Sequence, residues 1–260
     1  MIALLTDFGL RDTYVAELKA VLLTAAPGVP LVDITHCVEP FDVAQGAFLL
    51  AQAAAAFPAG AIFLAIVDPG VGTERRPVAF RSGAQRVYVG PDNGLFQRVV
   101  RREGAIEAVE LPSLPHRYAG GSSATFHGRD IFAPVAAALW NGTALADAGL
   151  PIDPATLSAE PPAGPGQGRC AVLHVDSFGN AITSLVPETV PCEPGTKIVL
   201  ETPESRHLLP VIRTYAQGPE GRPSLLINSA GHLEICCNRG SAAALLGLRP
   251  GMALRLRLDQ

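Results

Sequence analysis

The hydrophobic and polar positions of this chain follow two patterns, which change near residue 160. In the first part, short continuous apolar runs alternate with segments of helical spacing, typical of an α/β domain whose mostly parallel sheet is buried on both faces. The apolar runs predict strands at residues 2–6, 31–34, 61–67, 78–80 and 86–89. Helical spacing predicts a first helix after Asp12 or Thr13, with Tyr14, Leu18, Val21 and Leu22 on its apolar side, and further helices at residues 41–57 and 130–139.

The second part begins after a segment rich in proline and glycine, residues 151–169, which is a linker candidate. Beyond it the apolar positions alternate with a period of two, most clearly at residues 252–258, and residues 197–200 and 233–237 are further predicted strands. We therefore predict an N-terminal α/β domain at residues 1–155 and a smaller all-β domain at residues 168–260.

Composition narrows the class of protein. The 260 residues carry a net charge of −4 without a block of lysines or arginines, so neither nucleic acid nor a membrane is an expected partner. The alanine-rich residues 51–57 are too short to cross a bilayer, and the N-terminus lacks the basic region of a signal peptide. Five cysteines without CxxC spacing indicate a reducing, cytoplasmic setting and no zinc site.

The first candidate site follows the predicted strand at residues 61–67. Asp68 stands at the carboxyl end of that strand, where ligands bind in open α/β sheets. Gly70 and Gly72 allow a tight loop, and Arg75 returns a positive charge toward the same edge. An acid and a guanidinium on one glycine loop could form a polar site. The alternative is a β-turn with a surface ion pair.

Two more candidates lie in the same part of the chain. Asp7 follows the first predicted strand, where a carboxylate could bind a ribose diol or could simply cap a helix or turn. His127 precedes a predicted helix and could act as an acid–base group or a hydrogen-bond donor, although a lone histidine there is often structural. A metal site is weakly indicated because HxH, HxxxH and HExxH spacings are lacking.

The predicted β domain carries its own polar group. Asp176, Phe178 and Asn180 lie within five residues, and an aromatic ring beside amide and carboxylate groups suits a flat base and a charged amine. The alternative is an Asx-type turn between two strands. Asn228, Ser229 and Glu234 are further polar candidates in this domain.

Each motif alone is ambiguous, but their order along almost the whole chain is specific. Together they resemble the S-adenosyl-L-methionine (SAM) hydroxide adenosyltransferase family, adenosine-forming SAM hydrolases related to the SAM-dependent fluorinase and chlorinase. The segments that carry the resemblance are residues 6–9 (TDFG), 40–43 (PFDV), 67–73 (VDPGVGT), 91–94 (PDNG), 126–130 (FHGRD), 176–180 (DSFGN) and 228–229 (NS).

The resemblance implies an N-terminal α/β domain, a C-terminal β domain and a homotrimer with SAM bound between neighbouring subunits. It implies no cofactor, because SAM is the substrate, and no metal. The family's hydrolytic triad corresponds to Asp68, Arg75 and His127. Its substrate-binding residues correspond to Asp7, Asp176, Phe178, Asn180, Asn228, Ser229 and Glu234.

The implied reaction is the attack of water on C5′ of SAM, giving adenosine and L-methionine. The sulfonium is already a good leaving group, so the protein has to position the water and accept its proton; Asp68 or His127 could be the acceptor, since arginine is too weak a base. The fluorinase-type pattern has a tyrosine and a serine at residues 126–128, where this chain has His127 and Gly128. A chlorinase-like halogenase, a SAM or nucleoside sensor without turnover and a metal-dependent hydrolase are the alternatives.

Overall fold

The structure is a computed structural model, and it describes residues 1–112, 123–157, 168–187, 190 and 192–259. The chain divides into two compact units, Met1–Pro161 and Pro162–Gln260. Each unit contains one seven-stranded sheet among its described residues. The α/β and all-β architectures expected from the sequence are confirmed.

The sheet of the N-terminal unit has the strand order β2-β1-β3-β5-β4-β6-β7. Strands β2, β1, β3 and β5 are parallel, and β4, β6 and β7 form an antiparallel edge, so the parallel part is the core of a mixed sheet. The strands are β1 (Ile2–Thr6), β2 (Leu31–Thr35), β3 (Ile62–Ile66), β4 (Pro77–Ser82), β5 (Val87–Pro91), β6 (Ala105–Glu110) and β7 (Leu150–Ile152).

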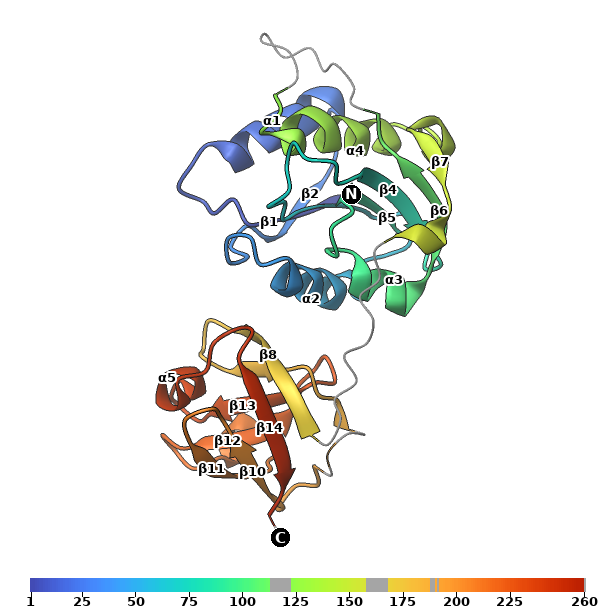
Figure 1. Cartoon of the computed structure of the whole chain (residues 1–260). Helices are drawn as coiled ribbons and strands as arrows, with labels where there is room; N and C mark the ends of the chain where they lie inside the picture. Colours follow the sequence, from blue (N-terminus) through green and yellow to red (C-terminus); the bar gives the residue numbers. More distant parts are fainter. Residues whose placement is uncertain (113–122, 158–167, 188–189, 191, 260) are drawn as a thin grey trace. The chain divides into compact units, whose positions relative to one another are not determined.

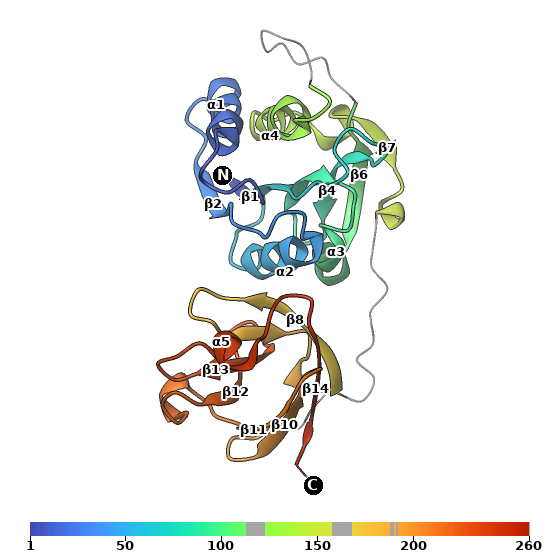
Figure 2. The same cartoon turned by 60° about the vertical axis from the view of Figure 1, so that its left-hand side comes forward.

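Helices cover both faces of this sheet. Helices α1 and α4 lie on one face and α2 and α3 on the other (Figure 1), an arrangement that Figure 2 shows from another side. They are α1 (Tyr14–Ala25), α2 (Val43–Ala54), α3 (Gln97–Glu103) and α4 (Ala133–Trp140), with the π-helix η1 (Gly128–Phe132) before α4 and the 3-10 turns η2 (Leu145–Asp147) and η3 (Pro154–Thr156).

The continuous apolar runs follow from this layering. In β1, Ile2 and Leu4 pack in the core beneath α1 and α4, whereas Ala3 and Leu5 pack in the core beneath α2. Because successive strand residues point to opposite faces, a strand covered on both sides must be apolar at every position.

Three details differ from the sequence-based expectations. Helix α2 starts at Val43 rather than at residue 41, because Asp42 caps it by accepting a hydrogen bond from the Gln45 N–H and Phe41 has a φ of 68°. Tyr14 lies at the start of α1 with its side chain 47% exposed, instead of facing the core. Strand β7 and turn η3 occupy the first part of the proline-rich segment predicted as a linker, and residues 158–167 of that segment lie outside the described residues.

The C-terminal unit is a nearly closed antiparallel barrel, in the order β11-β10-β14-β8-β9-β13-β12. An isolated bridge between Val211 and Leu225 joins its two edges. Its elements are β8 (Arg169–Val175), β9 (Ala181–Thr183), β10 (Lys197–Glu201), β11 (Arg206–Pro210), the turn η6 (Tyr215–Gln217), β12 (Pro223–Ile227), β13 (Leu233–Cys237), α5 (Ala242–Leu246) and β14 (Ala253–Leu258).

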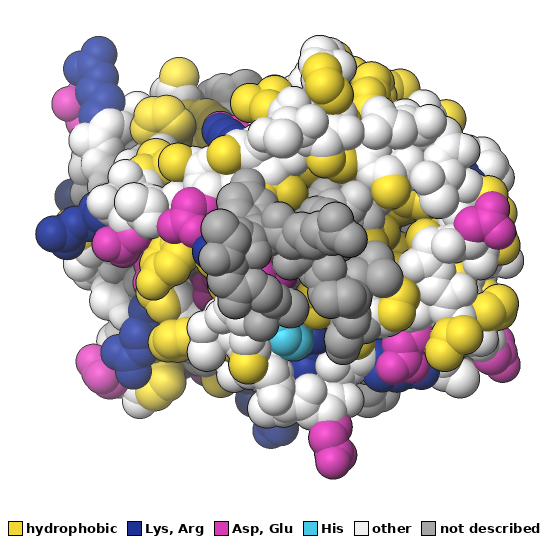
Figure 3. Space-filling view, turned by 90° about the horizontal axis from the view of Figure 1, so that it is seen from above, with side chains coloured by type: hydrophobic (Ala, Val, Ile, Leu, Met, Phe, Trp, Pro, Cys, Tyr) yellow, Lys and Arg dark blue, Asp and Glu magenta, His cyan; other side chains and the backbone are white. Residues whose placement is uncertain are grey.

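Acidic and basic side chains both lie around the margin of the face shown in Figure 3, with hydrophobic side chains scattered between them. Among the described residues, no helix has both the length and the apolar character needed to cross a membrane. All five cysteines are free thiols.

Candidate active site

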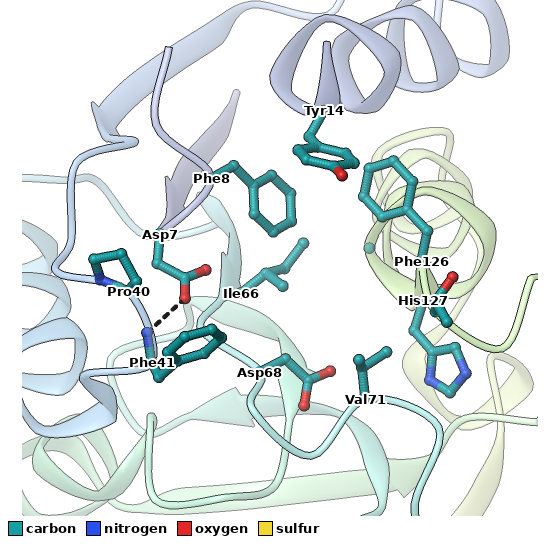
Figure 4. A pocket seen from close by; sticks show the side chains of 12 residues that line it. Asp7, Phe8, Tyr14, Pro40, Phe41, Ile66, Asp68, Val71, Phe126 and His127 are labelled. Atoms are coloured by element: carbon teal, nitrogen blue, oxygen red, sulfur yellow. Dashed lines mark hydrogen bonds between the residues drawn. The ribbon is translucent and has the colours of Figure 1, made fainter. Parts of the chain in front are cut away.

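The two carboxylates of the N-terminal unit come together because of the sheet topology. Strands β1 and β3 are parallel neighbours, with Thr6 opposite Ile66, so their carboxyl ends reach the same edge of the sheet. Asp7 and Asp68 follow these ends, and both line a cavity of about 240 Å³. Figure 4 shows their carboxyl groups pointing toward the cavity. The placement at strand ends is the one that the sequence predicted.

Asp68 and Arg75 form a two-pronged ion pair. The Arg75 Nε donates to Asp68 Oδ1 at 2.9 Å, and Arg75 Nη2 donates to Asp68 Oδ2 at 2.5 Å. Both side chains are less than a tenth exposed, at 9% for Arg75 and 6% for Asp68. A buried, bidentate pair is much more rigid than the surface ion pair that was the alternative interpretation.

His127 completes a chain of three side chains. Arg75 Nη2 lies 2.8 Å from His127 Nδ1. Because a guanidinium only donates hydrogen bonds, Nδ1 must be the acceptor, and the imidazole proton resides on Nε2. Burial and then the positive charge of Arg75 lower the pKa of His127, whereas Asp68 and Asp130 oppose this shift. The imidazole is therefore held in its neutral form at neutral pH.

Arg75 is placed behind the cavity rather than in its wall. Asp68 and His127 are among the lining residues, whereas Arg75 is not among them. Its guanidinium carbon lies 5.3 Å from the centre of the Phe132 ring, and its Nη1 is buried without a hydrogen-bond partner among the described residues. The arginine thus braces two cavity-facing groups.

The loops that carry this triad pack closely. Gly72 has a φ of 77°, and a Cβ atom there would lie 2.6 Å from the carbonyl oxygen of Ala124. His127 immediately precedes the π-helix η1, a rare conformation that is frequent at functional sites. A Cβ on Gly128 would lie 3.1 Å from Ile66 and 3.4 Å from Phe8, so this glycine lets the helix start close to β3.

The carboxyl group of Asp7 binds a neighbouring backbone N–H and also faces the cavity. Its Oδ2 accepts a hydrogen bond from the Phe41 N–H at 3.0 Å, drawn as a dashed line in Figure 4. Burial raises the pKa of Asp7, and the nearby Asp68 acts in the same direction. Asp7 does not cap α1, whose N-cap residue is Thr13. The carboxyl group also lines the cavity.

Aromatic side chains that the sequence analysis did not assign to the site form another wall. Phe8, Tyr14 and Phe126 contact one another edge-on or tilted, with ring centres 5.3 to 5.9 Å apart. Phe41 also lines the cavity and is 71% exposed. The signal available in the sequence was only their position beside Asp7, Pro40 and His127; helical spacing even assigned Tyr14 to the core.

The polar residues of the C-terminal unit form a second cluster. Asp176 Oδ1 accepts hydrogen bonds from the N–H groups of Phe178 and Asn180, both at 2.9 Å, and Oδ2 accepts from the Asn180 side chain at 2.9 Å. This is the Asx-type turn that was the alternative interpretation, and it leaves the Phe178 ring 78% exposed. The turn connects β8 to β9.

Glu234 lies in the same cluster, buried on β13. Its two carboxylate oxygens accept hydrogen bonds from the Tyr215 hydroxyl at 2.9 Å and from the Asn228 side chain at 3.1 Å. Burial raises the pKa of Glu234, and Asp176 is close enough to raise it further. Tyr215 was not identified from the sequence. Ser229 is exposed beside Asn228.

The described residues contain no group of three or more histidine, cysteine, aspartate or glutamate side chains placed to hold a metal ion. Asp7, Asp68 and His127 line one cavity, but Asp68 and His127 are both bound to Arg75. A bound cation would have to displace or lie beside that guanidinium.

Comparisons with known proteins give a consistent result. Residues 2–149 match the model of the SAM hydroxide adenosyltransferase N-terminal domain, and residues 170–255 match that of its C-terminal domain. The chain is 43% identical to the (R)-S-adenosyl-L-methionine hydrolase of Thermus thermophilus over 97% of both chains. It is 28% identical to a fluorinase of Actinoplanes, over 98% of this chain and 96% of the fluorinase.

A solved structure of a conserved protein from Thermotoga maritima superposes with a TM-score of 0.91 at 32% identity, covering 98% of this chain and 99% of the other. Sequence, fold and family models therefore agree over both units. The chain belongs to the SAM hydroxide adenosyltransferase family.

Proposed function

We propose that this protein hydrolyses SAM to adenosine and L-methionine, and that Asp68, Arg75 and His127 carry out the reaction. The observation that supports this most directly is the Asp68–Arg75–His127 chain at the wall of a cavity lined by aromatic rings. The relatives' name specifies the R configuration at sulfur, so (R)-SAM is the proposed substrate.

The proposed step is an in-line displacement. The water oxygen forms a bond to C5′ while the C5′–S bond breaks and its electron pair returns to sulfur, which becomes the thioether of methionine. The proton of the attacking water goes to Asp68, because His127 Nδ1 already accepts from Arg75. The Nε2–H of His127 then serves to orient the water. Correct placement of two reactants can contribute up to roughly 7–11 kcal/mol.

The remaining residues bind the substrate in this proposal. The cavity-facing carboxyl group of Asp7 accepts hydrogen bonds from the ribose hydroxyls. Asp176, Phe178 and Asn180 hold the adenine and the methionine ammonium group together with Asn228, Ser229 and Glu234. Neither Asp176 nor Glu234 forms an ion pair with lysine or arginine among the described residues, which leaves negative charge for a cationic ligand.

Gly128 is the residue that argues against a halogenase activity. This residue has no hydroxyl to donate to a halide, and a Cβ at this position would already lie 3.1 to 3.4 Å from three side chains. A serine would therefore require these neighbours to shift.

The first experiment incubates metal-stripped protein with each SAM epimer in chloride-free buffer and quantifies products by chromatography. Equal amounts of adenosine and methionine, unchanged by EDTA, would support the proposal. Turnover that needs chloride would indicate a halogenase, turnover abolished by EDTA a metal-dependent hydrolase, and intact SAM that co-purifies with the protein a sensor.

We also propose a cytoplasmic homotrimer in which the N-terminal unit of one copy and the C-terminal unit of its neighbour form each site. Co-expression of an Asp68→Asn chain with a Glu234→Gln chain tests this. At SAM concentrations far below the KM of the Glu234→Gln variant, mixed oligomers would show more activity than either variant alone, because one site in such an oligomer has two intact halves. Light scattering would give the number of copies.

A further inference from the structure

The PDNG segment at residues 91–94 lies next to the triad loop without lining the cavity. The loop that carries Asp68 and Arg75 runs from β3 to β4, and β5 lies between those two strands in the sheet. Strand β5 is parallel to β3, and its last residue, Pro91, pairs with the first residue of β4, Pro77. The loop therefore has to cross the carboxyl end of β5, where Asp92 and Asn93 follow.

Asn93 holds the loop where it leaves β3. Its side-chain amide donates to the carbonyl oxygen of Val67 at 2.8 Å, and Val67 immediately precedes Asp68. The side-chain oxygen accepts from the Leu95 N–H at 3.2 Å, which determines which end of the amide faces Val67.

Asp92 holds the loop where it enters β4. Its carboxylate Oδ2 accepts from Arg76 Nε at 3.1 Å and Arg76 Nη2 at 2.5 Å, and its own N–H donates to the carbonyl oxygen of Arg76 at 2.9 Å. The Asp92 side chain is 6% exposed. Arg76 also donates to the Thr156 side chain and carbonyl oxygen, so the contact continues into η3.

We infer that Asp92 and Asn93 are positioning residues for the proposed hydrolysis: two consecutive side chains hold the triad loop at both ends and so set the direction of Asp68 and Arg75. Arg75 and Arg76 are neighbours whose guanidinium groups bind different carboxylates, Asp68 and Asp92. Anchoring Arg76 therefore keeps it from competing for Asp68 and restricts where Arg75 can turn. Misplacement of reacting groups by about 1 Å can cost roughly 100-fold in rate.

The test compares Asp92→Asn and Asn93→Asp with the wild type. Asp92→Asn removes the charge that binds Arg76. Asn93→Asp replaces the donor to Val67 by a negatively charged oxygen while keeping the acceptor for Leu95. Because neither residue lines the cavity, we expect kcat to fall about 10- to 100-fold while KM for SAM changes little. Asp92→Glu, which keeps the carboxylate, should recover part of the loss.

A second readout is independent of turnover. Arg75, Asp68 and Asp130 are the charged groups that act on His127, and of these Arg75 lowers its pKa. A loosened Arg75 should therefore let the pKa of His127 rise, which an NMR titration of labelled histidines measures, with the His127→Asn variant assigning the signal.

The matched control is Glu103→Gln. Glu103 is a buried carboxylate in the same unit that binds Arg86, Ser82 and Tyr88, and none of these lines the cavity. The Glu103→Gln substitution should lower the melting temperature but leave kcat and the pKa of His127 unchanged. Folded Asp92→Asn and Asn93→Asp proteins with wild-type kcat and wild-type His127 titration would overturn the inference.

Should Asp92→Asn fail to fold, the kcat of Asn93→Asp decides alone, since this variant leaves the Asp92–Arg76 pair intact. A wild-type protein that does not hydrolyse SAM would refute the proposed function instead. The histidine titration would still show whether the loop is held as described.

Discussion

The two polar clusters of this protein differ in how their charges are balanced. In the N-terminal unit, Asp68 is neutralised by Arg75, which also binds the neutral His127. In the C-terminal unit, Glu234 accepts hydrogen bonds only from uncharged donors among the described residues, and Asp176 adds a second negative charge nearby. A balanced, rigid cluster suits the positioning of a water, whereas an unbalanced one suits the binding of a cation.

The largest effect is expected from removing the charge of Asp68. Asp68→Asn keeps the shape but cannot accept a proton, so kcat should fall by about 10²–10⁴-fold, the usual contribution of an acid–base group. Product chromatography measures it. Glu107→Gln, which weakens an exposed ion pair with Arg81 in the same unit, is the control and should keep full activity. Wild-type kcat in Asp68→Asn would remove this carboxylate from the mechanism.

Substitutions in the C-terminal cluster should raise the KM for SAM rather than lower kcat. Glu234→Gln removes the negative charge that, in the proposed function, attracts the cationic substrate. Hydrogen bonds to charged groups contribute about 1.5–3 kcal/mol, so KM should rise roughly 10- to 150-fold. The matched control is Glu201→Gln, because Glu201 is already neutralised by Arg257. A variant that instead lost kcat at constant KM would place chemistry in this unit and contradict the division between the two clusters.

A smaller change is expected from Phe178→Ala. An exposed ring that stacks on adenine contributes about 1–3 kcal/mol, which corresponds to roughly a 5- to 150-fold increase in KM. Calorimetric titration with adenosine measures the same loss directly. Leu208→Ala, which also truncates an exposed apolar side chain of this unit, should bind adenosine normally; equal losses in both variants would argue against stacking.

The smallest expected effect is the pH dependence of kcat, which the N-terminal cluster determines through His127. His127 has a pKa below its usual 6.5, so it stays neutral at pH 7 and takes up a proton only as the pH falls further. That proton would occupy Nδ1 and displace the hydrogen bond from Arg75. We expect kcat to be constant from pH 7 to 8 and to decline below pH 6.5, in step with the NMR titration of His127. A decline that begins above pH 7 would show that the imidazole is not held neutral.

Local sequence patterns were sufficient for the parallel core and the strand-end carboxylates. Strand β1 has to be apolar throughout because both of its faces are buried, and Asp7 and Asp68 follow the ends of such strands. Both features depend on neighbours in the sequence. The same local logic assigned Tyr14 to the core, and this was wrong, because helical spacing does not tell which side of a first turn meets a cavity.

The sequence by itself determined the two-unit architecture, the family and the residue types available for chemistry, since these depend on periodicity and on the order of motifs. Tertiary structure alone decided their pairing. From the sequence, Arg75 could have bound either Asp68 or Asp92. Glu234 could have formed an ion pair with a lysine or an arginine instead of its hydrogen bond with Tyr215. These choices follow from strand order, which brings residues 67, 76, 92 and 93 to one sheet edge through contacts that no local pattern encodes.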